Sequence, residues 1–344
     1  MRVGIIGLPQ SGKTSYFSAV TGIPVDLGVR EARIGMVHVP DPRLEAIADL
    51  VGAAKRTPPE LEFVDMISID TDGKGQSEDF VKRIGNSDVC AIVCGGMAPS
   101  TDSVVSDLDR VITELTLADL ISVDRRLERV EKELGRGKKE LAHERDRLSA
   151  LKAILERGAP LRNAADAKPL LQHFRGFELL SARPVLAVVN RPQRLQSEID
   201  GPAVAHAERL GTAALCLDAS LERDLLEIDP EERSLFMEAE GLEDLAAPRT
   251  IRACFELLDV VTFYTAGENE TRAVTIRSGT TAWEAAGKVH SDIQKGFQRA
   301  EVVDYDAFIS GGGWPGAKSA GRFRLEGRDY PVADGDIVNI RFTS

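Results

Sequence analysis

The sequence has little that could support a disulfide-stapled, zinc-bound or membrane-spanning protein. It contains only four cysteines, at positions 90, 94, 216 and 254, and none of them forms a C-x-x-C pair, which argues against a disulfide framework or a zinc site. The five histidines lie far apart and lack the spacing of metal ligands. No segment reaches 18 consecutive apolar residues, so we expect no transmembrane helix and no membrane partner.

Basic residues are also fewer than acidic residues. The chain has 43 lysines and arginines against 55 aspartates and glutamates, and its net charge of −12 excludes a generally basic nucleic-acid-binding coat. Apolar residues make up 43% of the 344 residues, which is typical of a globular protein, and the length predicts two or three folded units. The sequence does not start with a signal-peptide pattern, so we expect a soluble, cytoplasmic protein.

Two stretches of the chain alternate short apolar runs with helical patterns, as α/β units with a parallel sheet do. These stretches are residues 1–113 and 178–256, and we expect them to form one discontinuous domain. The strand candidates in them are 2–6, 36–39, 61–64, 89–94, 184–189 and 213–217.

The intervening segment, residues 114–177, predicts a helical insertion. Five apolar residues recur at alternating steps of three and four, as in a coiled-coil seam: Leu120, Val123, Leu127, Val130 and Leu134. Gly135-Arg136-Gly137 interrupts this pattern and a second helical pattern follows, so we expect an antiparallel helical hairpin. Residues 121–160 hold 11 basic and 8 acidic residues, a local excess of positive charge. This excess indicates either a solvated helix face or a contact for RNA.

Residues 257–344 predict a separate, small α+β module. Short strand candidates follow each other closely, at 260–264, 273–276, 322–325 and 338–342. One helix interrupts them, and Thr281 and Glu284 form a capping box at its start.

A phosphate-binding loop is predicted near the N-terminus. Gly7-Leu8-Pro9-Gln10-Ser11-Gly12-Lys13-Thr14 matches G-x-x-x-x-G-K-[ST] directly between a strand and a helix. Glycines let backbone amides turn toward phosphate oxygens, and the next helix presents its positive end. Lys13 would bridge the β- and γ-phosphates and Thr14 would bind Mg²⁺, which makes these two the candidate catalytic residues. The candidate nucleotide-binding residues are Gly7, Leu8, Pro9, Gln10, Ser11, Gly12, Lys13, Thr14 and Ser15.

Two further residues stand where predicted strands end. Asp65 follows the strand at 61–64, where a carboxylate could complete the magnesium site with Thr14, although an aspartate that merely ends a strand is also common. Asn190 follows the strand at 184–189, where purine bases are often recognised; the alternative is an asparagine that starts a turn before Pro192.

Several longer stretches carry a family resemblance: Val39-Pro40-Asp41-Pro42-Arg43-Leu44, Leu117-Ala118-Asp119-Leu120, Tyr264-Thr265-Ala266-Gly267-Glu268, Gly279-Thr280-Thr281-Ala282 and Lys295-Gly296-Phe297-Gln298-Arg299-Ala300-Glu301-Val302. Together with the order of the parts, they resemble the YchF-type subgroup of the Obg-related P-loop NTPases. The resemblance implies a nucleotide-binding domain interrupted by a helical hairpin and followed by a β-grasp (TGS) domain. It also implies an ATP-preferring NTPase that associates with ribosomes.

The departures from the family pattern gather around the nucleotide. Gln10 replaces an asparagine of the loop, Val29 stands where the switch threonine is expected, and Ser68 replaces the glycine of D-x-x-G. The base-reading motif N-x-x-E becomes Asn190 to Gln193, which weakens the expected preference between ATP and GTP. Ile69 keeps the hydrophobic character that this subgroup has in place of a water-orienting glutamine.

Two functions therefore remain open from the sequence. One is a slow NTPase switch that uses ATP or GTP with Mg²⁺ and engages ribosomes or RNA through the hairpin and the TGS module. The other is a noncatalytic nucleotide-binding or scaffold protein that has lost hydrolysis.

Overall fold

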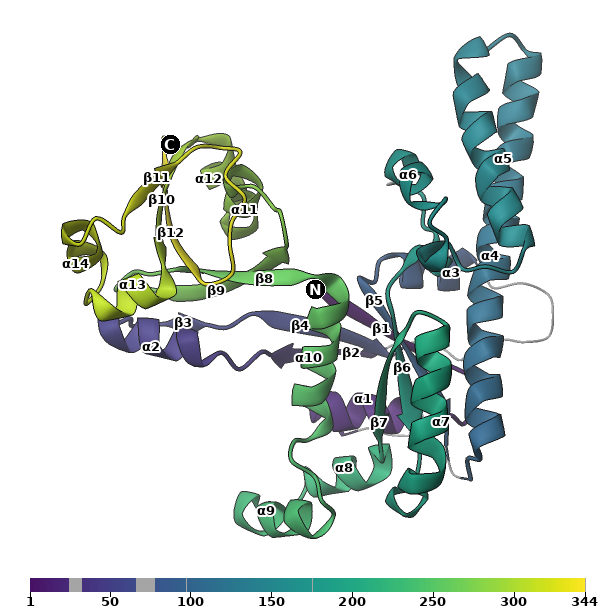
Figure 1. Ribbon diagram of the computed structural model, residues 1–344, viewed down its shortest axis with the longest axis horizontal. Helices are drawn as coiled ribbons and strands as arrows, with labels where there is room; N and C mark the ends of the chain where they lie inside the picture. The colour runs from purple at the N-terminus through teal and green to yellow at the C-terminus, as the bar shows by residue number, and fades with distance from the viewer. Residues whose placement is uncertain (25–32, 66–77, 97, 175, 344) are drawn as a thin grey trace. The chain divides into compact units, whose positions relative to one another are not determined.

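The chain forms two compact units, each with its own six-stranded sheet (Figure 1). The computed structural model describes residues 1–24, 33–65, 78–96, 98–174 and 176–343. The first unit comprises Met1–Val37 and Glu62–Leu257, and the second comprises His38–Leu61 and Leu258–Ser344. Of the helices within the described ranges, none is long and apolar enough to cross a bilayer.

The sheet of the first unit has the strand order β2-β4-β1-β5-β6-β7. Its strands are β1 (Arg2–Gly7), β2 (Arg33–His38), β4 (Glu60–Asp65), β5 (Val89–Gly95), β6 (Val185–Asn190) and β7 (Ala213–Leu217). The pairs β1–β4, β1–β5, β5–β6 and β6–β7 are parallel, which confirms the predicted α/β class. Because parallel strands end at the same edge, Gly7, Asp65, Gly95 and Asn190 come together there.

The first unit also contains nine α-helices in the described ranges, several of which cover the sheet. They are α1 (Lys13–Thr21), α3 (Glu78–Gly85), α4 (Thr101–Gly135), α5 (Ala142–Glu156), α6 (Lys168–Leu171), α7 (Gln196–Arg209), α8 (Ala219–Leu225), α9 (Pro230–Ala239) and α10 (Ala246–Leu258). α4 and α7 bury apolar side chains such as Leu108 and Ile199 against Ile92 of β5 and Val189 of β6. Since β5 and β6 lie in the middle of the sheet, almost all their side chains are buried, and the two strands read as unbroken apolar runs.

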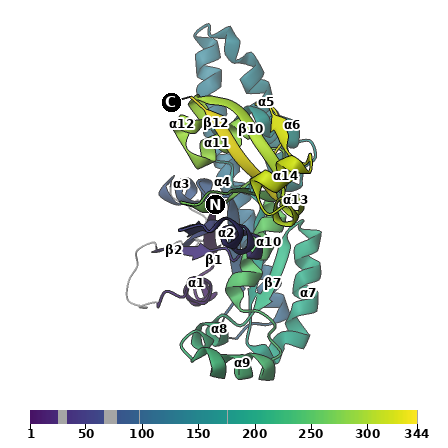
Figure 2. The same cartoon turned by 90° about the vertical axis from the view of Figure 1, so that its left-hand side faces the viewer.

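The predicted hairpin is formed by α4 and α5, joined through a short 3-10 turn, η1 (Lys139–Leu141). Figures 1 and 2 show α4 running on beyond the sheet, with α5 returning beside its far half. Val123 and Val130 of the predicted seam are fully buried against Leu148 and Leu151 of α5. An apolar seam between antiparallel helices is what the spacing of three and four predicts.

The root of the hairpin is fixed to the sheet by one buried carboxylate. Asp119 of α4 accepts hydrogen bonds from the backbone amides of Leu180 and Ser181, both at 2.7 Å, and from the Ser181 hydroxyl at 2.6 Å. Burial raises the pKa of Asp119 to about 6, although the three donors favour its charged form. At neutral pH a charged and fully bonded group thus ties α4 to the segment that leads into β6.

The second unit has the strand order β11-β10-β12-β8-β9-β3. Its strands are β3 (Arg56–Thr57), β8 (Val260–Thr265), β9 (Thr271–Arg277), β10 (Phe297–Asp304), β11 (Arg324–Glu326) and β12 (Asp336–Phe342). Its helices are α2 (Pro42–Val51), α11 (Ala282–Val289), α12 (Ser291–Lys295), α13 (Tyr305–Ser310) and α14 (Trp314–Ser319). The capping box of Thr281 and Glu284 starts α11 as predicted, and α11 buries Ala282 and Ala285 against the sheet.

Residues 38–61 do not belong where the sequence placed them. We expected them in the nucleotide-binding domain, but the structure groups them with the C-terminal module. Arg56 of β3 pairs with Thr271 of β9, and the hydroxyl of Tyr264 donates to Asp41 at 2.5 Å. These contacts join residues more than 200 positions apart, so the local pattern could not indicate them.

Candidate functional site

The predicted phosphate loop connects β1 to α1 at the carboxyl edge of the first sheet. Gly12 precedes the first residue of α1 with a φ of 89°, and Gln10 has a φ of 64° in the left-handed region. A side chain at Gly7 would place its Cβ 2.4 Å from the carbonyl oxygen of Val93 on β5. The loop can therefore lie against the neighbouring strand only with glycine at this position.

Lys13 lies folded back across the loop. Its Nζ donates to the carbonyl oxygen of Leu8 at 2.7 Å, and the residue is 7% exposed. Burial lowers the pKa of Lys13 to about 8, and the nearby charge of Asp65 opposes this shift. The ammonium group is thus poorly hydrated, which favours its pairing with a nearby anion.

Asp65 and Thr14 meet beside this lysine. The Thr14 hydroxyl donates to the Asp65 carboxylate at 3.4 Å, and burial raises the pKa of Asp65 against the attraction of Lys13. A partly buried carboxylate and a hydroxyl form the oxygen donor set that Mg²⁺ prefers. These two residues could therefore hold a magnesium ion.

The remaining loop positions divide into outer and inner ones. Pro9 and Gln10 are exposed, whereas Ser11 is buried and its hydroxyl oxygen has no partner in the described part of the chain. Thr14 and Ser15 are half-buried in the first turn of α1.

Asn190 bridges the loop to the start of α8. Its Nδ2 donates to the carbonyl oxygen of Ser11 at 3.0 Å, and its Oδ1 accepts from the backbone amide of Ala219 at 3.1 Å. A Cβ on Gly12 would lie 2.0 Å from the Asn190 amide nitrogen. The structure thus places the predicted base-reading asparagine against the loop backbone, where it positions the loop.

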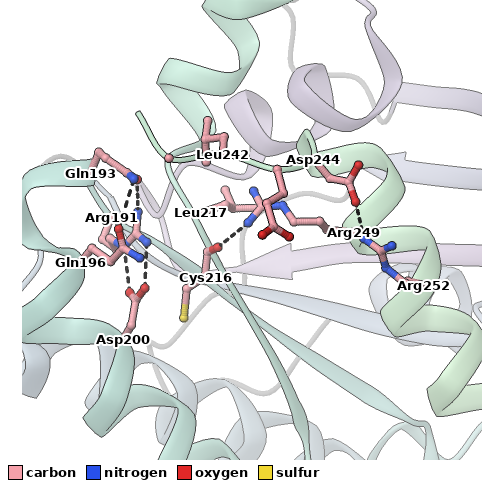
Figure 3. Close-up of a pocket in the computed structure, with 12 residues that line it drawn as sticks. Arg191, Gln193, Gln196, Asp200, Cys216, Leu217, Leu242, Asp244, Arg249 and Arg252 are labelled. Carbon is pink, nitrogen blue, oxygen red and sulfur yellow. Dashed lines mark hydrogen bonds and ion pairs between the residues drawn. The ribbon is translucent and has the colours of Figure 1, made fainter. Parts of the chain in front are cut away.

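Gln193 is held in one orientation by four hydrogen bonds. Its backbone amide donates to Asp218 at 3.0 Å, and its Oε1 accepts from Arg191 at 3.0 Å. Its Nε2 donates to Gln196 at 3.1 Å (Figure 3) and to the carbonyl oxygen of Glu240 at 3.0 Å. With both Nε2 hydrogens engaged, its free capacity is limited to acceptance at Oε1.

Gln193 borders a cavity of about 270 Å³ between α7, the end of β7 and α10 (Figure 3). Each of the three arginines in the wall is paired with a carboxylate: Arg191 with Asp200, Arg249 with Glu222 and Arg252 with Asp244. These charges are already balanced, so the cavity is less suited to phosphate than the loop is. Cys216 also lines it, and burial raises the pKa of its thiol to about 12, which keeps the thiol protonated.

Two glycines that the sequence analysis did not single out also shape the loop. Gly95 is the last residue of β5 and Gly96 follows it, with φ values of 100° and 125°. A Cβ on Gly96 would lie 2.4 Å from the carbonyl oxygen of Gln10, and one on Gly95 would lie 2.2 Å from that of Asn190. A glycine pair directly after a buried strand was the available signal. The expected switch positions Val29, Ser68 and Ile69 lie outside the described residues.

The parallel sheet, the loop between β1 and α1, and the residues at the carboxyl edge define a P-loop nucleotide-binding protein. A family model called YchF-GTPase_C, described as "Protein of unknown function (DUF933)", matches residues 260–343. The sequence is 34% identical to the ribosome-binding ATPase YchF of Haemophilus ducreyi and 33% identical to that of Bacillus subtilis, over 99% of each chain. The fold is similar to that of the Schizosaccharomyces pombe YchF GTPase, with a TM-score of 0.84 and 23% identity over 99% of this chain and 97% of that chain. The chain therefore belongs to the YchF family, which confirms the resemblance seen in the sequence.

The close approach of Gly96 to the loop yields a first prediction. Replacing Gly96 by alanine should push the loop away from its position, because the new Cβ would overlap the backbone oxygen of Gln10. We expect the affinity for a fluorescent ATP analogue to fall at least tenfold, about 1.4 kcal/mol. Gly135→Ala is the matched control, since a Cβ there meets nothing within 4 Å. Equal affinities of the two variants would contradict this role of Gly96.

Proposed function

We propose that this protein is a slow, Mg²⁺-dependent nucleoside triphosphatase that accepts ATP or GTP and binds ribosomes. The observation that carries the enzymatic part is the meeting of Lys13, Thr14 and Asp65 at a loop shaped to surround phosphates. In support, the curated relatives are named ribosome-binding ATPases and the similar solved structure is titled a GTPase.

Each of these residues has a defined task in the proposed reaction. Lys13 exchanges the Leu8 carbonyl oxygen for the β- and γ-phosphate oxygens, where its charge offsets the charge that develops on the phosphoryl group. Thr14 and Asp65 would hold Mg²⁺, which would supply Lewis-acid stabilisation of the phosphoryl group. Asn190 keeps the loop backbone in place while this happens.

The base-binding end supports weak discrimination between adenine and guanine. A carboxylate at position 193 would accept hydrogen bonds with a full negative charge, whereas the Gln193 oxygen is neutral and already accepts from Arg191. The strong preference that a free carboxylate could impose is therefore not expected here.

The hairpin is the part of the first unit best suited to ribosomal RNA. It is the segment with a local excess of positive charge, and Arg136, Lys138 and Lys139 lie exposed at its tip. The C-terminal module, from residue 263 on, has 10 basic and 11 acidic residues and offers no comparable attraction.

The central test compares the purified protein with its Lys13→Ala variant. Wild type should bind ATP and GTP within tenfold of each other and release phosphate slowly in the presence of Mg²⁺. The variant should lose at least tenfold in affinity and its Mg²⁺-dependent turnover, because the phosphates lose the buried cation of the loop. EDTA should abolish turnover but leave weaker binding. Tight binding without turnover would favour the noncatalytic alternative, and no binding at millimolar concentration would reject both.

The lowered pKa of Lys13 predicts a pH dependence of nucleotide binding. Without nucleotide, Lys13 has a pKa of about 8. Bound phosphates would raise this pKa, so above pH 8 the protein takes up a proton on Lys13 when nucleotide binds. The affinity should be constant from pH 6.5 to 7.5 and decrease as pH rises beyond 8, by up to tenfold per pH unit. Titrations of a fluorescent ATP analogue from pH 6.5 to 9.5 measure this. Lys13→Arg, if it binds, should give a flat profile, whereas a flat wild-type profile would contradict the shifted pKa.

Ribosome binding can be tested by co-sedimentation at low and high salt. The double variant Arg136→Glu/Lys139→Glu should bind at least tenfold more weakly and show a shallower salt dependence, since phosphate contacts are lost. Lys82→Glu/Lys168→Glu changes the net charge equally at exposed positions outside the hairpin tip and should bind like wild type. Wild-type failure to co-sediment at low salt would reject the ribosomal part alone.

A further inference from the structure

Helix α9 presents two large apolar side chains to solvent. Leu235 is 68% exposed and Phe236 is 52% exposed, and within α9 no residue is buried. Leu235 is the most exposed of the large apolar residues in the described part of the chain. Exposed neighbouring apolar side chains of this size are typical of interaction surfaces.

The helix is nevertheless firmly attached to its unit. Arg233 points inward and donates to the backbone carbonyl oxygens of Leu225, Leu226 and Ile228, at 2.8, 3.3 and 3.0 Å. Asp229 caps the first turn through the Glu231 amide at 3.0 Å, and Pro230 occupies the first helical position. Because α9 is held through Arg233 and its cap, its outer face is free to contact another molecule.

The surroundings of Leu235 and Phe236 are strongly acidic. Residues 229–244 contain seven acidic residues and one basic residue, Arg233, whose side chain is turned inward. These sixteen residues thus carry half of the net charge of the whole chain. A surface of this sign repels phosphate groups of RNA and of anionic lipid, and it attracts cationic partners.

This face also adjoins the nucleotide-binding region. The carbonyl oxygen of Glu240, at the end of α9, accepts the hydrogen bond from Gln193 at 3.0 Å. The loop after it contributes Leu242 and Asp244 to the cavity that Gln193 borders (Figure 3).

We propose that α9 is a docking surface for a basic protein segment that carries apolar side chains. We call it the acidic face; it consists of Leu235 and Phe236 with Glu231, Glu232, Glu238 and Glu240. Apolar side chains of the partner cover Leu235 and Phe236, and its lysines or arginines meet the surrounding carboxylates. Apolar contact gives affinity and the charges select the partner and speed the encounter.

The test uses a fluorescein-labelled, 14-residue amphipathic peptide of lysine and leucine, followed by anisotropy with the full chain. Leu235→Ser/Phe236→Ser and Glu231→Lys/Glu238→Lys should each weaken binding at least tenfold. The matched controls are Leu117→Ser/Ile121→Ser, which removes a similarly exposed apolar pair on α4, and Glu128→Lys/Glu131→Lys, which reverses exposed charges on the same helix. Both controls should bind within twofold of wild type. A peptide with serine in place of leucine should bind at least tenfold more weakly than the original.

Three results would overturn the proposal. Equal losses in the α4 controls would show that the peptide responds to exposed apolar side chains and acidic charge wherever they lie on the protein. Binding of poly-uridine RNA that is lost in Leu235→Ser/Phe236→Ser would assign the face to nucleic acid. Light scattering that shows a dimer in wild type and a monomer in the same variant would make the face a contact between two copies of this chain.

Discussion

The nucleotide site depends on one buried side-chain amide, that of Asn190. A loop that turns its amides toward phosphates leaves several of its own carbonyl groups without helical or strand partners, and each buried unpaired group costs free energy. The Asn190 amide satisfies the carbonyl of Ser11 and, through its oxygen, the first amide of α8. A Cβ at position 12 would overlap the Asn190 amide nitrogen, so this position of the loop requires glycine.

From this amide, hydrogen bonds continue into the helices behind the loop. α8, whose start Asn190 fixes, carries Glu222, which is buried and paired with Arg249 of α10. The next residue of α10, Thr250, shares a 3.0 Å hydrogen bond with the buried Tyr16 of α1. Two neighbouring residues of α10 thus support this region. Arg249 acts on the phosphate loop through Glu222 and Asn190, and Thr250 holds α1 through Tyr16. A loop fixed from both ends has less freedom to lose when it binds phosphate, which increases affinity.

What the sequence could predict was set by local pattern. The loop motif and the apolar strands around it depend on neighbouring residues, so Lys13, Thr14 and Asp65 could be placed at one edge before the structure was known. The side-chain partners of Gln193 could not, because Glu240 comes from a helix nearly fifty residues away. Strand β10 was not predicted either, since it pairs with β11 and β12, which both lie further along the chain.

The electrostatics of Lys13 and Asp65 explain why the site should prefer a bound polyphosphate. Burial disfavours the charged form of both groups, lowering the pKa of the lysine and raising that of the aspartate. Their mutual attraction offsets only part of this cost, since both pKa values remain shifted in the direction that burial gives. A magnesium-bound triphosphate would supply the missing opposite charge to each. Binding would therefore offset the desolvation cost of both groups, in an environment where charge interactions are stronger than in water.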